Sequence, residues 1–230
     1  MAYPLIFDAV RACDVEAMRR EIAAGGDPDM LHGGGAELTP LYYAACWHSG
    51  SPGEQIRERL ECISVLLEAG ASVDKLVCGA TPLYHAVVSS PAAVVEALVE
   101  AGADVNWTHP PSRQSVLTMA AQISTAGTVR MLISAGAVDL TTALEFAIDN
   151  DKQRNCAPLL RAGAAIQKIR AGIPLPTHVY IQKICAAGGY KAYEKAHRQR
   201  LVAMFLPKFP TLPVEMLGRV LEFTWDIGGH

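Results

Sequence analysis

Short apolar segments occur in pairs along the 230-residue chain, and polar turns separate them. The first segment of a pair begins with Thr-Pro-Leu or a variant of it, and the second ends in Ala-Gly-Ala. The first segments are TPLYYA (39–44), TPLYHA (81–86), SVLTMA (115–120) and TALEFA (142–147). The second segments are LLEAGA (66–71), LVEAGA (98–103), LISAGA (132–137) and LLRAGA (159–164). Because the order never changes, the pattern predicts repeated pairs of helices.

The spacing within the pairs is regular. In three consecutive copies the first phrase and the Ala that follows Gly lie 22 residues apart, from 81 to 103, from 115 to 137 and from 142 to 164. The copy from 39 to 71 is ten residues longer, and the excess lies in HSGSPGEQIR at 48–57. We interpret this excess as a loop insertion within an intact repeat.

Each pair has a physical start and end. Thr begins the first helix, and Pro at its first position leaves no hydrogen bond unmade. Small Ala residues let neighbouring helices pack closely. Glycine should end the second helix, where a left-handed residue is needed, and it stands at Gly70, Gly102, Gly136 and Gly163. Residues 4–29 fit the same frame without Thr-Pro-Leu, and Asp14 and Val15 start their second helix. They indicate a degenerate first repeat that caps the stack.

The phrases TPLYHA and LVEAGADVN (98–106), with their 22-residue separation, closely resemble the consensus of ankyrin repeats. The resemblance implies an all-α solenoid of five helix-turn-helix repeats over residues 1–166, with short hairpin loops and a helical cap at 167–230. Two departures stand out. Tyr84 occupies the position of a His that usually links neighbouring repeats, and Pro158 is expected to interrupt the second helix of the fifth repeat.

The resemblance further implies a concave side, formed by the first helices and the hairpin tips, that binds another protein. The expected partner-binding residues are Arg11, Cys46, Trp47, Val88, Ser89, Trp107, His109, Gln122, Ile123, Asp149 and Asn150. Trp47, Val88 and Ile123 would form an apolar stripe. Two alternatives remain open: the insertion at 48–57 covers Trp47, and Trp107 packs within its own hairpin.

Beyond residue 166 the repeat phrase is absent and a Pro-rich join at 173–178 precedes helical patterns. The first pattern spans 178–187, and the second follows Gly188-Gly189. In the second pattern we expect one basic outer face and one core face. The basic residues are Lys191, Lys195, Arg198 and Arg200, and the core residues are Tyr190, Tyr193, His197, Leu201, Met204 and Phe205.

A third helix is expected to begin near Pro213. Its opening loosely resembles an F-box, and its place after ankyrin repeats is similar to terminal boxes, such as the SOCS box, that connect some ankyrin proteins to ubiquitin ligases. The adaptor-binding residues would be Leu212, Met216, Leu217, Val220 and Leu221. A substrate-recognition adaptor of a ubiquitin ligase is therefore the alternative function. The same spacing also fits a structural cap over the last repeat.

Charge is divided unevenly, with a balance of −9 over residues 1–160 and +6 over 161–230. Between 161 and 208 there are nine Lys and Arg, and Glu194 is the single acid. This basic tail leaves an acidic partner, an anionic membrane surface or nucleic acid as a minor alternative.

Composition and motifs argue against several other classes of protein. From the first residues given we expect no secretory signal, the sequence has no apolar run long enough for a membrane span, and its six cysteines have no zinc spacing. A cytoplasmic or nuclear protein is expected. Gly33-Gly34-Gly35 lacks the context of a phosphate-binding loop, and no histidine has metal-ligand spacing. We expect a non-catalytic protein-binding scaffold with no cofactor or metal.

Overall fold

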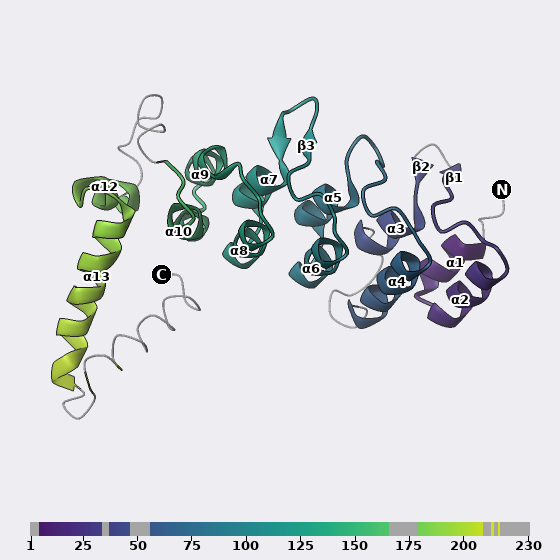
Figure 1. The fold of residues 1–230 in the computed structure, drawn as a ribbon, viewed down its shortest axis with the longest axis horizontal. Coiled ribbons are helices and arrows are strands. Elements are labelled where there is room, and N and C mark those ends of the chain that lie inside the picture. Colours follow the sequence, from purple (N-terminus) through teal and green to yellow (C-terminus); the bar gives the residue numbers. More distant parts are fainter. Residues whose placement is uncertain are drawn as a thin grey trace. The chain divides into compact units, whose positions relative to one another are not determined.

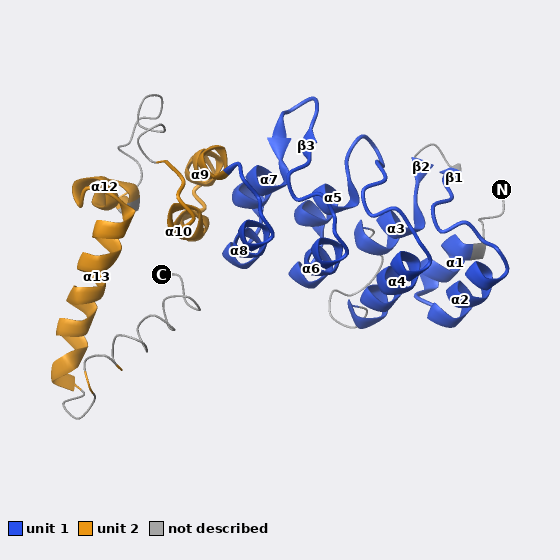
Figure 2. Cartoon of the chain, viewed as in Figure 1, with its two compact units in different colours: residues 1–139 blue, residues 140–230 orange. Residues whose placement is uncertain are grey.

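The structure, a computed structural model, describes residues 5–33, 37–46, 56–165 and 179–208, together with 213 and 216. The chain divides into two compact units, residues 1–139 and 140–230 (Figure 2). Among the described residues, the first unit holds four helix pairs, and the second holds a fifth pair and two C-terminal helices.

The first unit is a stack of paired helices. The pairs are α1 (Leu5–Ala12) with α2 (Val15–Ala23), α3 (Pro40–Cys46) with α4 (Ile56–Glu68), α5 (Pro82–Ser89) with α6 (Ala92–Glu100), and α7 (Val116–Ile123) with α8 (Ala126–Ser134). Each first helix packs against the first helix of the next pair, and the second helices do the same (Figure 1). The predicted solenoid of helix pairs is thus confirmed for this unit.

Hydroxyl side chains cap the N-termini of first helices, as the Thr-Pro-Leu phrase and its variants predict. The hydroxyl of Thr81 accepts a hydrogen bond from the Tyr84 N–H at 3.3 Å, and Ser115 accepts one from the Thr118 N–H at 3.1 Å. Pro82 occupies the first turn of α5. In the degenerate first repeat it is the second helix that is capped, because the Asp14 carboxylate accepts from the Ala17 N–H at 2.9 Å. The predicted helix start at Asp14 and Val15 is therefore confirmed.

Left-handed glycines end the second helices. Gly102 has φ +86°, and Gly70, Gly136 and Gly163 also have positive φ. After α6 the Gly102 N–H donates to the Val99 carbonyl and the Ala103 N–H donates to the Leu98 carbonyl, both at 3.0 Å. This pair of bonds is the Schellman motif, which satisfies carbonyls left open at a helix end.

Short hairpins lie between consecutive pairs of the first unit. Strand β1 (His32–Gly33) pairs with β2 (Glu37–Leu38), and β3 (Thr108–His109) pairs with β4 (Gln114–Ser115), both antiparallel. Between them Val77 and Ala80 form a single bridge. In Figure 1 these hairpins stand beyond the first helices, on the side away from the second helices.

Two sets of polar bonds join neighbouring repeats. In the first set an Asp or Asn side chain, in the loop that follows a second helix, accepts a hydrogen bond from a backbone N–H of the next repeat. Asp29 accepts from Ser72, Asp74 from Asp104, and Asn106 from Val138. In the second set a serine after a first helix donates to a carbonyl of the preceding repeat: Ser90 to Ala45, and Ser124 to Val87. Each bond contributes about 1 kcal/mol net.

The core of the first unit is built mainly from leucines at equivalent positions. Leu41, Leu83 and Leu117 of the first helices have at most 1% of their surface exposed. Leu66, Leu98 and Leu132 of the second helices are fully buried. Burying a side chain of this size contributes roughly 1.5–3 kcal/mol, so the repeats are held together mainly by apolar contact across their interfaces.

The second unit contains α9 (Leu140–Asp149), α10 (Gln153–Arg161), α12 (Val179–Ala186) and α13 (Tyr190–Phe205). The expectation that Pro158 interrupts the second helix of the fifth repeat is wrong, because α10 continues through it to Arg161. Pro158 itself is buried, as are Leu159 and Leu160 beside it, so packing of this segment outweighs the lost backbone hydrogen bond.

The C-terminal helices begin and end close to the predicted positions. Helix α13 contacts α10, and Arg161 forms a 2.9 Å ion pair with Glu194. Lys191, Lys195, Arg198 and Arg200 are exposed, as predicted. The core face is only partly confirmed: Tyr190 is buried, but Met204 is 54% exposed.

Among the described residues no helix is both long and apolar enough to cross a membrane. Within the same residues, no group of three or more His, Cys, Asp or Glu side chains is placed to hold a metal ion.

Candidate protein-binding surface

Two apolar side chains remain exposed at the C-terminal ends of adjacent first helices. Val88 of α5 is 51% exposed and Ile123 of α7 is 39% exposed. The buried faces of the same helices already carry the core, through residues such as Leu83 and Leu117. Val88 and Ile123 are therefore not needed to hold the repeats together, and α5 packs directly against α7.

The hairpin at residues 107–115, here called the finger, is fixed to α5 by aromatic contacts. The Tyr84 ring stacks on the His109 ring with centroids 5.4 Å apart and meets the Trp107 ring edge-on at 5.2 Å. Ser112 lies 3.0 Å from His109 Nδ1. Trp107 is half-buried, so it holds the finger in place and still presents part of its ring to solvent.

The finger is also connected to the exposed end of α7. The Gln114 side-chain amide donates to the Gln122 side-chain carbonyl at 3.3 Å. The finger, Gln122 and the neighbouring Ile123 therefore belong to one continuous part of the surface.

Aromatic residues at one position of the repeat link successive repeats, and this position is the one where Tyr84 replaces the expected linking His. Phe7 contacts Tyr43 with centroids 6.3 Å apart, and Tyr42 contacts His85 at 5.0 Å. Tyr84 continues the series by contacting the finger. These three residues occupy the same place in the repeat, directly after the first buried aliphatic residue of each first helix. That shared position was the signal available in the sequence.

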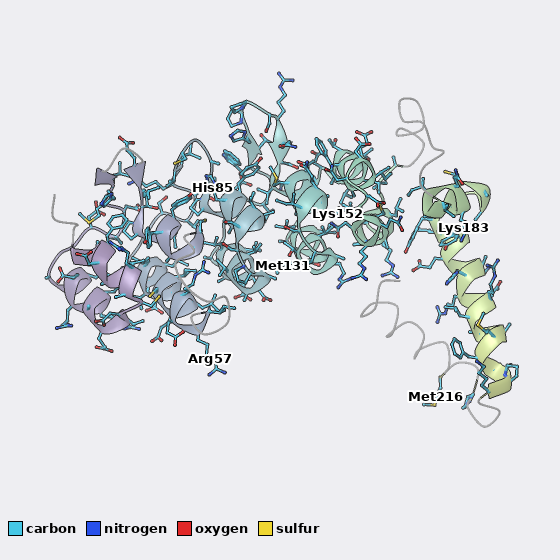
Figure 3. The ribbon with its side chains drawn as sticks, turned by 180° about the vertical axis from the view of Figure 1, so that it is seen from behind. Arg57, His85, Met131, Lys152, Lys183 and Met216 are labelled. Atoms are coloured by element: carbon cyan, nitrogen blue, oxygen red, sulfur yellow. The ribbon has the colours of Figure 1, made fainter. Side chains whose placement is uncertain are left out.

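Ionisation in this region follows from burial. Burial raises the pKa of Tyr84, and a hydrogen bond with Ser112 opposes the rise. Burial lowers the pKa of His85, although its Nε2 lies 3.1 Å from the Val77 carbonyl, which favours the charged form. Because a carbonyl only accepts, Nε2 carries the proton of the neutral ring. Figure 3 labels His85, which α5 places on the hairpin side of the first unit.

Cys46 requires a correction. It was expected to line the binding surface, but it is buried, and its thiol donates to the Pro82 carbonyl at the start of α5 at 3.7 Å. Burial raises the pKa of Cys46 to about 12. Cys46 is therefore an inert packing residue between α3 and α5 and is not available for contact with a partner.

The remaining expected contact residues have varied surroundings. Arg11 and Ser89 are exposed, and Gln122 and His109 are half-buried. Asp149 and Asn150 are exposed at the end of α9, in the second unit. Trp47 lies outside the described residues.

Most of the proposed adaptor-binding segment also lies outside the described residues. This applies to Leu212, Leu217, Val220 and Leu221. Met216, labelled in Figure 3, is 56% exposed.

Paired helices with intervening hairpins and polar bonds between repeats define a helical repeat solenoid. Residues 6–109 match the family model of ankyrin repeats, with three copies. Residues 6–109 are therefore ankyrin repeats. Ankyrin repeats generally mediate protein–protein interaction and are typically non-catalytic. No curated protein matches the chain in a sequence search.

Proposed function

We propose that the chain is a non-catalytic scaffold that binds a partner protein on the first-helix surface of its first unit. This surface comprises Val88, Ser89, Gln122 and Ile123 on α5 and α7, the finger with Trp107 and His109, and Arg11 on α1. The observation that carries the proposal is the exposure of Val88 and Ile123 on adjacent helices, beside a finger that is already fixed in place.

The composition of this surface suits protein recognition. A half-buried Trp is a favoured anchor at protein interfaces, and apolar side chains around it exclude water when a partner covers them. The stacking of Tyr84 on His109 orders the finger before any partner arrives. A partner therefore loses less entropy in ordering this part of the interface.

The test is affinity capture with matched variants. The double variant Val88→Glu/Ile123→Glu adds two negative charges to the proposed surface. The control Arg130→Glu makes the same change in net charge at an exposed position on the second helix α8. Proteins retained by the unaltered chain should be lost at least tenfold with the double variant and retained with the control.

Thermal unfolding must be measured for both variants, because a folding defect would also abolish capture. Equal retention by the double variant and the unaltered chain, with both folded, would contradict this placement of the binding surface.

A further inference from the structure

The helices at the centre of the first-helix surface carry no charged side chain. Within the described helices α3, α5 and α7, no residue is Asp, Glu, Lys or Arg. The second helices α4, α6 and α8 differ, because each exposes charged residues such as Arg57, Glu96 and Arg130. Figure 3 shows Arg57 pointing outward on the side of the second helices. The two sides of the stack therefore offer a partner different chemistry.

Polar side chains on α5 and α7 have hydrogen-bond partners within the chain. The Ser89 hydroxyl donates to the His85 carbonyl at 3.1 Å, and the Gln122 side-chain carbonyl accepts from Gln114 at 3.3 Å. The His85 ring bonds to the Val77 carbonyl, and its lowered pKa keeps the ring neutral at pH 7. What these two helices offer a partner is therefore mainly apolar surface.

Two charged side chains from other elements reach these first helices, and both are already bound there. Arg59 of α4 donates to the Ala44 and Ala45 carbonyls at the end of α3. The Asp139 carboxylate accepts from the Ser115 hydroxyl, which caps α7. These bonds hold both charges within the fold.

Two further charges belong to the proposed surface but not to its central helices. Arg11 lies on α1, two repeats before α5, and Arg113 lies in the turn of the finger. Both side chains are exposed to water. An exposed charge contributes little to binding, because water and salt screen it. The contact at Val88 and Ile123 is therefore governed by apolar burial.

We propose, on the basis of the function proposed above, that the partner presents an uncharged, apolar segment to Val88 and Ile123. A charge brought against these two side chains would lose its water shell and find no opposite charge on α5 or α7. The penalty applies to acidic and basic segments alike. The surface thus discriminates against charged partners without a charged residue of its own.

The experiment uses the full chain as the target and a phage-displayed library of short random peptides as the probe. Counter-selection on the double variant Val88→Glu/Ile123→Glu removes peptides that bind elsewhere. We expect the retained peptides to contain fewer Asp, Glu, Lys and Arg residues than the starting library, and more Leu, Ile, Phe and Trp. Enrichment of acidic or basic residues in the retained peptides would overturn the proposal.

The strongest retained peptide is then synthesised, and its Kd is measured for variants of opposite charge. Val88→Glu/Ile123→Glu and Val88→Lys/Ile123→Lys should each raise the Kd at least tenfold, whereas the control Arg130→Glu should leave it unchanged. For the unaltered chain the Kd should change less than about twofold between roughly 50 and 500 mM NaCl. Tighter binding by either double variant, or a tenfold loss in high salt, would contradict the proposal.

These outcomes separate this proposal from the proposed function. Charged peptides that require Val88 and Ile123 would leave the binding surface in place and contradict only its preference for an uncharged partner. A selection in which every peptide also binds the folded Glu double variant would contradict the surface itself, and this proposal with it. Circular dichroism and thermal unfolding establish that each double variant is folded before its Kd is compared.

Discussion

At the residue scale, the left-handed backbone conformation at the end of a helix favours glycine over every other amino acid. Gly102 ends α6 with φ +86°, where any side chain with a Cβ is strained even though nothing lies within 4 Å of the Cβ position. Gly127, within α8, has no positive φ, and a Cβ there would meet Thr125 Oγ1 at an ordinary 3.5 Å. A Cβ has enough space at both positions, but only at Gly102 would it strain the backbone. Comparing substitutions at the two glycines therefore isolates the effect of backbone strain.

We expect Gly102→Ala to lower the free energy of unfolding by about 1 kcal/mol or more, because Ala resists the left-handed conformation. Gly127→Ala should be neutral or raise it by up to about 1 kcal/mol, because Ala favours the helix. Urea titrations of both variants test the pair. Equal effects of the two substitutions would show that the left-handed geometry of Gly102 is not what limits this position.

His85 provides a second prediction at this scale. Burial and the nearby His109 hold its pKa below the ordinary 6.5. The unfolded chain then binds the proton more tightly than the folded chain, so this residue reduces stability as pH falls below about 6.5. An NMR titration of the His85 ring should give a midpoint below 6.5. A midpoint at or above that value would show that the Val77 hydrogen bond outweighs burial.

At the element scale, neighbouring helix pairs are coupled by bonds that recur in the repeat frame. Ser90 and Ser124 each donate to the preceding first helix, and Asp29, Asp74 and Asn106 each accept from the next loop. Because a repeat does not bury its apolar face alone, these bonds add directional specificity to an interface whose main stabilisation is apolar.

Ser124→Ala tests this coupling. The substitution removes the 2.7 Å bond to the Val87 carbonyl, and we expect a loss of about 1 kcal/mol in the free energy of unfolding. Ser134→Ala, at an exposed position of α8, should change it by less than about 0.5 kcal/mol. Denaturant titrations that give the same small effect for both would show that the inter-repeat bond adds little.

The positions of many helices could be predicted from the sequence. The positions of Thr81, Pro82 and Gly102 determine helix starts and ends by local chemistry, which a sequence displays directly. Pro158 was misjudged because its burial depends on contacts that local propensity does not encode. Met204 was misjudged because helical spacing shows which residues share a face, but not whether another segment covers it.

At the scale of the whole molecule, the candidate surface was only partly predictable. The repeat frame placed Val88 and Ile123 at exposed ends of first helices, where the structure also has them. The same frame failed for Cys46, because the start of α5 covers it and no sequence feature of α3 indicates that contact. Trp107 contacts His109 within its own hairpin, with ring centroids 5.9 Å apart, as one of the two alternatives expected. It also contacts Tyr84 of the preceding repeat, and the sequence of the hairpin does not display that contact.

The ligase-adaptor alternative stays a prediction. A folded variant with Met216→Asp should lose a co-purified ligase subunit if the terminal segment is a recruitment box, and it should keep the partner bound by the first-helix surface. If this variant retains every partner, recruitment through Met216 is contradicted.

Site-specific photo-cross-linking tests the central claim most directly. A photoreactive amino acid is placed at Val88, at Ile123 or at the control position Arg130, and the chain is irradiated in cell extract. The account predicts that Val88 and Ile123 cross-link to the same protein and that Arg130 does not. A partner that cross-links at Arg130 and at neither Val88 nor Ile123 would contradict it.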